Sequence, residues 1–304
     1  MTFTIMITTH NRCADLRRTC AALTALSPPP DEVLICADGC TDDTVSMVAG
    51  EFPGFVILEN AERQGSVASR DRMLRLASAD IVISLDDDSY PIDPDFLARV
   101  GRVLDEHPEA AVVSFAEIRD SDRNDPGAPA RDERAGRYVA AYANWGAAMR
   151  RDVYLDLAGF PKFFGHMYEE PDYAVQCYAA GLAVWFEPDL VVRHHLSGVN
   201  RHAGRRQRLH ARNELWSVLI RCPWPYLSAV ALFRVWRQLR YAATQSLSDV
   251  LLQPAWWLSA LRGVPQCISG RDPIPWQAYW GWMKLARRRI DRRELVVALG
   301  RTGK

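Results

Sequence analysis

The first 86 residues alternate four apolar, β-rich runs with segments of helical spacing, and this alternation constrains the fold more than any other feature. The runs are rich in Ile, Val, Leu and Thr, whereas the segments between them repeat apolar residues every three or four positions. Strands that alternate with helices form βαβ units, so a mostly parallel sheet with helices on both faces is expected. The expected strands are 3–9, 32–38, 54–60 and 80–86, and the expected helices are 14–26, 45–52 and 66–78.

Polar residues follow three of these strands at the point where each strand ends. They are His10 and Asn11 after the first strand, Asp38 and Gly39 after the second, and the run Asp86–Asp88 after the fourth. In open α/β sheets the ligand crevice lies at the carboxyl ends of the strands. The acidic run and Asp38 are therefore expected to share one site.

Three consecutive carboxylates repel one another, and a bound divalent cation is the simplest way to offset this repulsion. Mg²⁺ and Mn²⁺ prefer oxygen ligands, and they bind one or two carboxylates together with water and phosphate oxygens. Alternate side chains of an extended segment point the same way, so Asp86 and Asp88 can address one ligand complex. A solvated acidic loop is the structural alternative. It suits Asp93 and Asp95, because Asp93 resembles a helix N-cap with Pro94 at the first helical position.

Motifs in a fixed order extend this pattern over residues 3–225. In order and spacing they resemble the successive motifs of family 2 glycosyltransferases, whose fold is GT-A. The resemblance implies a GT-A, Rossmann-like α/β fold and the transfer of a hexosyl or deoxyhexosyl group from a nucleotide-diphospho-sugar to an acceptor hydroxyl. The motifs are ITTHNR, ICADGCTDDT, NAERQGSVASRDRML, ISLDDDSYP, NWGAAMRRDVYLDLAGFPKFF, YEEPDYAVQCYAAG, FEPDLVVRHHLSGVNR and HARNELWSVLIRCPWP.

The resemblance also implies which residues hold the donor. Asp38 would accept the ring N–H of uracil or thymine, which favours a UDP- or dTDP-linked sugar, although Ala37 stands where the family usually has a second aspartate. Turn chemistry beside Gly39 is the alternative for Asp38, and a solvated helix face is the alternative for Arg70. Asp42 is expected to cap the following helix instead. The implied nucleotide-sugar residues are Thr9, Asn11, Asp38, Arg70, Asp86 and Asp87.

The resemblance assigns the metal, Mn²⁺ or Mg²⁺, to Asp88 and to a histidine at the end of a strand. Residues 190, 192 and 194 share one face of that strand, so His194 is the expected ligand. A shift of one residue in register would present His195 instead.

Two adjacent carboxylates, Glu169 and Glu170, match the acidic catalytic motif of the family. An inverting transfer needs a general base that takes the proton of the attacking hydroxyl, and neighbouring carboxylates raise one another's pKa, which favours this role. Glu170 is the expected base. Acidic residues at a helix N-terminus are the structural alternative, which Asp172 fits well.

Two other functions compete with this interpretation. Sugar-phosphate nucleotidylyltransferases typically have a Gly-rich segment with a basic residue after the first strand. The corresponding run of this chain, ITTHNR, contains no glycine. An inactive, glycan-binding relative is the second alternative, and the retained Asp38, Asp86, Asp88, Glu170 and His194 oppose it.

The cysteines and the hydropathy pattern favour a cytoplasmic protein. Seven cysteines without C-x-x-C pairs indicate reduced thiols, and neither a signal peptide nor an apolar run long enough to span a bilayer is expected.

The net charge of zero conceals a boundary near residue 200. Residues 200–304 carry 19 Lys/Arg against 5 Asp/Glu, and they hold eight of the ten tryptophans. The sequence therefore predicts a catalytic domain at 1–200 and a basic, amphipathic helical region at 201–304. This region is expected to lie on a membrane surface, beside a glycan or lipid-linked acceptor, rather than on nucleic acid. The alternative is a helical subdomain packed on the acidic catalytic domain.

Overall fold

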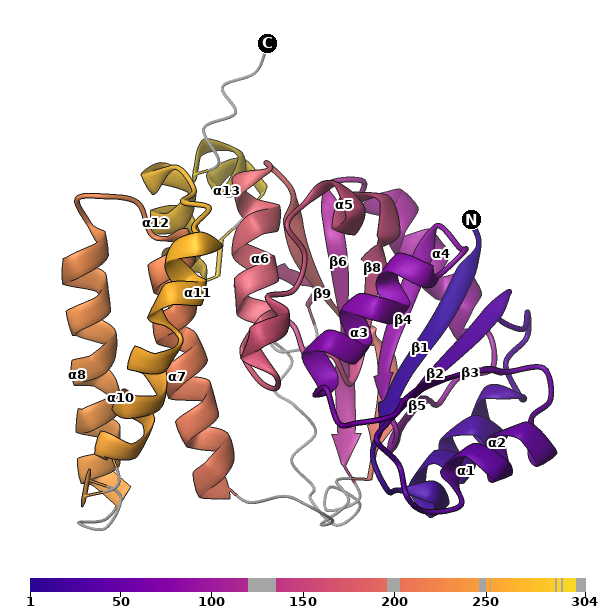
Figure 1. Cartoon of the computed structure of the whole chain (residues 1–304). Helices are drawn as coiled ribbons and strands as arrows, with labels where there is room; N and C mark the ends of the chain where they lie inside the picture. Colours follow the sequence, from indigo (N-terminus) through magenta and orange to yellow (C-terminus); the bar gives the residue numbers. More distant parts are fainter. Residues whose placement is uncertain are drawn as a thin grey trace.

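Residues 1–119, 135–195, 203–245, 250–251, 253–287, 289–290 and 292–298 are described by the computed structural model (Figure 1). Within them, the four expected strands form one parallel half of a larger sheet, in the order β3-β2-β1-β4. Three helices connect these strands, as the alternating pattern predicts. The strands are β1 (Phe3–Thr9), β2 (Glu32–Asp38), β3 (Val56–Asn60) and β4 (Ile81–Asp86), and the helices are α1 (Cys13–Leu23), α2 (Thr44–Glu51) and α3 (Ser66–Leu76).

The second half of the sheet follows the order β4-β8-β6-β9-β5. β8 is antiparallel to both β4 and β6, so β6 points the same way as β4, and β9 is parallel to β6. β5 and β7 are antiparallel to β9. The carboxyl ends of six strands therefore meet at one edge, which brings distant residues to one site. The additional strands are β5 (Ser89–Pro91), β6 (Ala110–Arg119), β7 (Arg137–Tyr138), β8 (Gly146–Arg150) and β9 (Ala183–His194).

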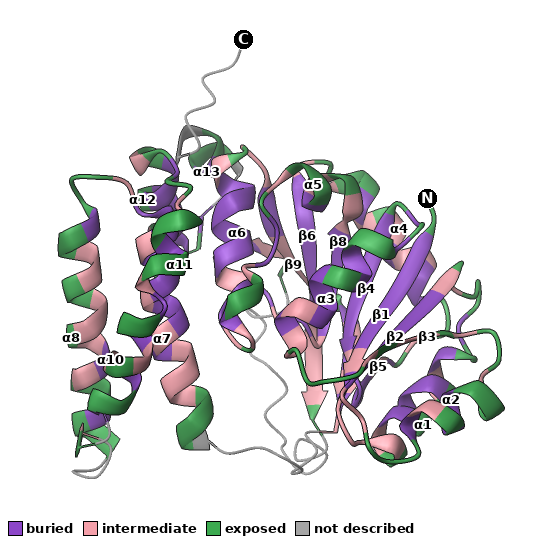
Figure 2. Ribbon diagram, in the orientation of Figure 1, coloured by how far each residue is buried: buried purple, intermediate pink, exposed green. Residues whose placement is uncertain are grey.

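Two hydrophobic clusters cover the two faces of the sheet. Met6 and Leu34 point into one cluster, with α3, α5 (Arg151–Asp156) and α6 (Glu169–Ala179), whereas Ile5 and Val33 point into the other, with α1, α2 and α4 (Phe96–Glu106). Because both faces are covered, the central strands are buried along their length (Figure 2), which explains their continuous apolar sequence.

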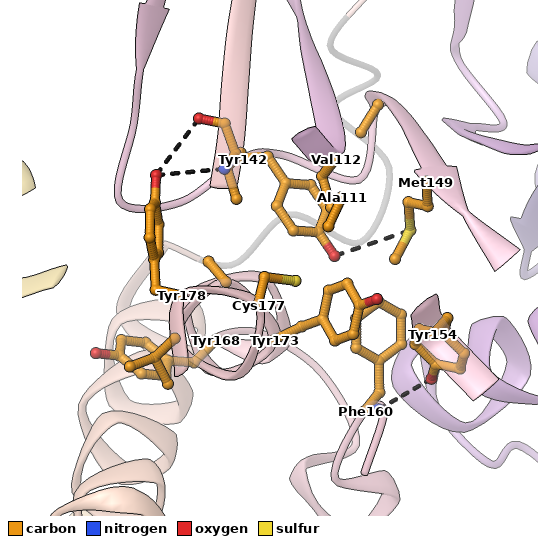
Figure 3. Packing of buried hydrophobic residues seen from close by; sticks show 14 of the residues in the cluster. Ala111, Val112, Tyr142, Met149, Tyr154, Phe160, Tyr168, Tyr173, Cys177 and Tyr178 are labelled. Atoms are coloured by element: carbon orange, nitrogen blue, oxygen red, sulfur yellow. Dashed lines mark hydrogen bonds between the residues drawn. The ribbon is translucent and has the colours of Figure 1, made fainter. Parts of the chain in front are cut away.

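The first cluster continues into the C-terminal helices. Aromatic side chains around α6 form its centre, among them Tyr173 and Tyr178 (Figure 3). Trp216 of α7 and Trp282 of α12 join the same cluster, and the Trp282 indole donates a hydrogen bond to the Ala140 carbonyl at 2.6 Å. Residues before and after the expected boundary at 200 thus share one core. The C-terminal helices are α7 (Ala203–Arg221), α8 (Leu227–Gln245), α10 (Gln253–Arg262), α11 (Val264–Ser269), α12 (Trp276–Leu285) and α13 (Arg292–Ala298).

The C-terminal region buries some of its tryptophans and exposes others. Trp216, Trp256 and Trp282 are buried, whereas Trp224 and Trp236 are exposed. Among the described helices, none combines the length and apolarity needed to cross a bilayer. The described region therefore combines a face packed on the sheet domain with an apolar outer face.

The sequence predicts that Asp42 and Asp93 both cap the helices that follow them. Asp42 lies one residue before the N-cap of α2, which is Asp43, but its carboxylate accepts the first backbone N–H of two helices, that of Thr44 at 3.2 Å and that of Cys13 at 3.1 Å. The prediction that Asp93 caps α4 is wrong, because that helix begins at Phe96. The Asp93 carboxylate instead pairs with Arg99 at 2.5 Å, and this ion pair competes with capping.

A buried ion pair joins α7 to α6, and its removal tests how much the contact between these helices contributes to stability. Asp172 is fully buried, and Arg221 contacts it at 3.1 Å. Replacing Arg221 by Met leaves this carboxylate uncompensated, so we expect the free energy of unfolding to fall by about 3–5 kcal/mol in urea titrations.

The matched control is Asp272→Asn, which removes the exposed second partner of Arg221. This change should cost less than about 1 kcal/mol. The Asp172→Asn change combined with Arg221→Met should recover part of the loss. Equal effects of the Arg221 and Asp272 changes would contradict a buried coupling between α6 and α7.

Candidate active site

A cavity of about 500 Å³ lies at the carboxyl edge of the parallel strands. Its floor comes from the ends of β1, β2 and β4, and its walls come from the start of α3, from the short helix η3 (Lys162–Phe164) and from the first turns of α7. Six of its lining residues are arginines, a set that suits phosphate groups. These are Arg12, Arg63, Arg70, Arg205, Arg206 and Arg212.

The three consecutive aspartates contact three basic side chains. Asp86 pairs with Arg70 at 2.5 Å, Asp87 pairs with Arg12 at 2.7 Å, and Asp88 lies 3.1 Å from a nitrogen of His194. Burial raises the pKa of Asp87 to about 7, although the Arg12 guanidinium opposes this shift. The acidic run is therefore packed among positive groups from three other elements rather than solvated.

Asp86, Asp88 and His194 form a group that could hold a metal ion. Each offers one ligand atom, and these atoms all lie within 4.8 Å of one another. Two carboxylates and one imidazole suit a divalent cation that tolerates both oxygen and nitrogen, such as Mn²⁺, and the carboxylates also suit Mg²⁺. The residues present thus fit the expected cation, and Asp86 joins the two ligands that the sequence indicated.

The register of β9 separates His194 from His195. His194 is paired with Ser89 of β5 and turns toward the aspartates, whereas the ring of His195 contacts the Tyr90 hydroxyl at 3.0 Å. Adjacent residues of a strand point to opposite faces, so only His194 joins the cluster. Glu117 of β6 contacts the other ring nitrogen of His194 at 2.6 Å, which fixes the orientation of the imidazole.

Glu169 and Glu170 begin α6 on the far side of Arg70. The Arg70 guanidinium contacts Asp86 at 2.5 Å and Glu169 at 3.3 Å, and it therefore joins the two acidic motifs. The Asn144 side chain also donates to Glu169 at 3.1 Å, and its backbone N–H donates to Glu170 at 3.3 Å. Neither glutamate is among the residues that line the cavity in the described structure.

The local environment of Glu170 suits a proton acceptor. Burial raises its pKa, and repulsion from Glu169 raises it further, while Arg70 opposes the shift. A carboxyl group with a raised pKa holds a proton more tightly than an ordinary glutamate does, which is the property required of a general base near neutral pH.

The segment before these glutamates has a conformation that α7 maintains. Met167 and Tyr168 both have positive φ angles, which non-glycine residues rarely adopt. Asn213 of α7 is fully buried, and its side-chain amide lies within hydrogen-bonding distance of the carbonyls of Phe164, His166 and Met167 at 3.2, 2.8 and 2.7 Å. Its neighbour Glu214 lies 3.4 Å from the Tyr168 hydroxyl. α7 therefore positions the start of α6.

The nucleotide-side residues divide into two groups. Asp38 is buried beside the cavity, and its carboxylate accepts the backbone N–H groups of Gln64 and Gly65, both at 2.8 Å. Thr9 lines the cavity and donates to Asp87 at 2.9 Å. Asn11 does not line the cavity as described, because its side chain binds Thr41. The structure thus brings Thr9, Asp38, Arg70 and Asp86–Asp88 together and leaves Asn11 at the margin.

Sequence reasoning missed four residues that contact the expected site. Arg12 directly follows the first strand motif, and its place there was a usable signal. Asn213 lies in the RNELW motif, for whose residues the sequence predicted no individual role. Glu117 and Asn144 come from distant segments and carry no local signal. Their contacts depend on the order of β8, β6 and β9 in the sheet.

Comparison with known families now identifies the chain. The sequence profile of glycosyl transferase family 2 matches residues 4–157, just over half of the 304 residues. The chain belongs to this family. Its sheet and flanking helices are those of a GT-A glycosyltransferase, as expected.

Solved structures of similar fold extend over the whole chain. The mannosyltransferase PcManGT from Pyrobaculum calidifontis, solved with GDP-Man and Mn²⁺, has a TM-score of 0.58 at 21% identity, with 97% of this chain and 85% of that one covered. S. aureus TarS 1–349, solved with UDP-GlcNAc, has a TM-score of 0.60 at 16% identity, with 98% and 89% covered. GalNAc-T7, solved with UDP, GalNAc and Mn²⁺, has a TM-score of 0.62 at 11% identity, with 90% and 58% covered.

At these identities the structural likeness shows the fold alone. A search of curated protein sequences gave no significant match. The family 2 glycosyltransferase described here thus has a nucleotide-sugar transferase fold and a cluster of residues suited to a divalent metal.

The contact between Glu117 and His194 generates a test of the metal cluster. Glu117→Ala removes the group that orients the imidazole, so we expect the affinity for Mn²⁺ to fall by roughly 10- to 100-fold in calorimetric titrations. Glu117→Gln, which keeps an acceptor oxygen, should lose less. Glu59→Ala, an exposed position on β3, is the matched control. Unchanged Mn²⁺ affinity in the Glu117→Ala protein would contradict His194 as a ligand.

Proposed function

We propose that this family 2 glycosyltransferase is a metal-dependent, inverting enzyme. It would transfer a sugar from a nucleotide-diphospho-sugar to a hydroxyl group of a glycan or lipid-linked acceptor. The observation that carries the proposal is the chain of contacts from the Asp86–Asp88–His194 cluster through the Arg70 guanidinium to Glu169, with Asp86 and Arg70 lining the cavity.

The donor would lie in the cavity, with its base near Asp38 and its diphosphate near the arginines. A carboxylate has about four acceptor sites. Asp38 uses three of them for Asn60, Gln64 and Gly65, which leaves room for one ring N–H of uracil or thymine. This favours a UDP- or dTDP-linked hexose or deoxyhexose. Arg12 and Arg70 line the same cavity and would contact phosphate oxygens.

Asp86, Asp88 and His194 would hold Mn²⁺ or Mg²⁺ when it is present. The bound cation would supply a Lewis acid for the charge that develops on the leaving diphosphate. Glu117 would keep the His194 ring in place. Arg12, which contacts both Asp87 and Asp88, would compensate part of their negative charge.

Glu170 would act as the general base. It would accept the proton of the acceptor hydroxyl as the oxygen attacks the anomeric carbon from the face opposite the nucleotide. Glu169, held by Arg70 and Asn144, would keep Glu170 in position at the start of α6. No covalent bond to the protein is needed, because a single displacement inverts the configuration.

Two observations weigh against the competing functions, namely the buried ion pairs of the aspartates and the sequence that follows β1. An inactive relative has no need for buried carboxylates that require compensation by Arg12 and Arg70. A nucleotidylyltransferase would use a glycine-rich first loop, and none follows β1. The seven cysteines are free thiols, which suits our proposal of a cytoplasmic location at the inner face of the membrane.

The first test concerns the cation. Asp88→Ala should abolish sugar transfer while leaving the thermal unfolding midpoint near that of the wild type, because the leaving diphosphate loses its neutralising charge. Wild-type activity should vanish in EDTA and return with Mn²⁺ or Mg²⁺, measured as nucleotide release across UDP-, dTDP- and GDP-sugars. Full activity in the chelator would refute the metal assignment.

The second test concerns the base. Glu170→Gln preserves shape but removes the proton acceptor, so kcat should fall by roughly 10²–10⁴-fold while donor binding persists. A base works only when deprotonated, and its pKa is raised above the ordinary 4.5. The kcat of the wild type should therefore rise with pH up to that raised pKa and then level off.

The Glu170→Gln protein should lack this rise. The product should have inverted anomeric configuration, which NMR of the new linkage can show. If Glu169→Gln causes the large loss and Glu170→Gln does not, the roles of the two glutamates are reversed.

A further inference from the structure

The C-terminal helical region carries most of the exposed large apolar side chains of the described protein. Twelve of the eighteen lie after residue 222. The remaining six are scattered over the sheet domain, where single exposed apolar residues are ordinary. Figure 2 shows exposed segments on α8, α10 and α11, in the helical region beside the sheet. A concentration of this kind marks an interaction surface.

Two helical stripes make up this surface. On α10, Leu258 and Leu261 are 59% and 66% exposed, and they share one face because they are three residues apart. Ile268 of the next helix, α11, is 67% exposed. On α8 the exposed side chains of Leu232 and Trp236 are four residues apart and share one face. We call these five side chains the outer apolar surface. α7 supports it from within, because both α8 and α10 pack against that helix.

The charge around the outer apolar surface has one sign. The segments 227–245 and 253–269 contain no Asp or Glu, whereas Arg240 and Arg262 are exposed beside the stripes. The Arg240 guanidinium lies over the Trp236 ring at 5.5 Å from its centroid. On α12, outside this surface, the Lys284 ammonium lies over the Trp280 ring at 5.6 Å. Paired basic and tryptophan side chains suit the headgroup level of a bilayer, where the ring is amphipathic and the cation meets phosphate.

We propose that the outer apolar surface docks on an anionic phospholipid membrane, with its arginines among the headgroups. A second copy of the chain is a poorer occupant. A two-fold interface would bring this surface against itself, and it would oppose positive charges without an acidic partner. An anionic lipid surface instead attracts each basic residue and accepts the apolar stripes at the boundary with the acyl chains.

The test is flotation of the full-length protein with vesicles of phosphatidylcholine and phosphatidylglycerol. The triple change Leu258→Ser, Leu261→Ser and Ile268→Ser should lower the partition coefficient by roughly 10- to 100-fold, because several apolar groups no longer enter the boundary. The same change on α8, Leu232→Ser with Trp236→Ser, should act in the same direction.

The matched control replaces three exposed apolar residues of the sheet domain, Val56, Leu76 and Leu155, by Ser. This protein should float like the wild type. Arg240→Gln and Arg262→Gln should each weaken binding by about fivefold at low salt, and high salt or pure phosphatidylcholine vesicles should have the same effect. Near-ultraviolet circular dichroism and the melting midpoint verify that each variant is folded.

Several outcomes would overturn the proposal. The wild-type chain failing to float with anionic vesicles is one, and equal flotation of the α10–α11 variant and the sheet-domain control is another. Light scattering provides the third, because a wild-type dimer that the α10–α11 changes convert to a monomer would assign the surface to a second copy. Flotation does not depend on sugar transfer, so its result and that of the proposed reaction can fail separately.

Discussion

The position of Arg70 between two acidic motifs is the interaction on which the candidate site depends. Its buried guanidinium contacts Asp86 on one side and Glu169 on the other. Five carboxylates lie in the two motifs, and buried charges of one sign are tolerated only when they are compensated. Arg70 therefore allows the end of β4 at Asp86 and the start of α6 at Glu169, which are far apart in sequence, to share one small volume. A bound cation would add to this compensation rather than replace it.

Contacts from α7 pack the C-terminal region against the start of α6. The start of α6 has an unusual backbone conformation, and Asn213 and Glu214 of α7 contact the segment that produces it. Arg221 compensates Asp172 within the first turn of α6. One face of α7 thus holds the helix that carries the expected base. The Asp172–Arg221 pair thus joins an acidic group of the sheet domain to a basic group of the helical region.

The sequence predicted the features that are local and left out those that depend on distant contacts. Alternating strands and helices, the polar strand ends and the face of β9 that carries His194 follow from periods of two and 3.6 residues. The part played by Arg12 or Glu117 does not, because each meets its partner only after strands far apart in sequence become neighbours. For the tryptophans, composition could not separate Trp282, which is buried, from Trp236, which is exposed.

The helical region presents arginines to the cavity and apolar side chains to the solvent. The first turns of α7 bring Arg205 and Arg206 to the cavity, where phosphate-bearing ligands suit them. The helices that pack on α7 expose apolar side chains, and the segments 227–245 and 253–269 contain no Asp or Glu. Arg234 pairs with Glu214 of α7, whereas Arg240 and Arg262 are exposed. α7 lines the cavity, contacts the segment before α6 and packs against both α8 and α10, so one helix connects the outer apolar surface to the catalytic edge. Membrane docking, in our proposal, would therefore fix the orientation of the catalytic edge relative to the lipid plane, which a flexible tether could not do.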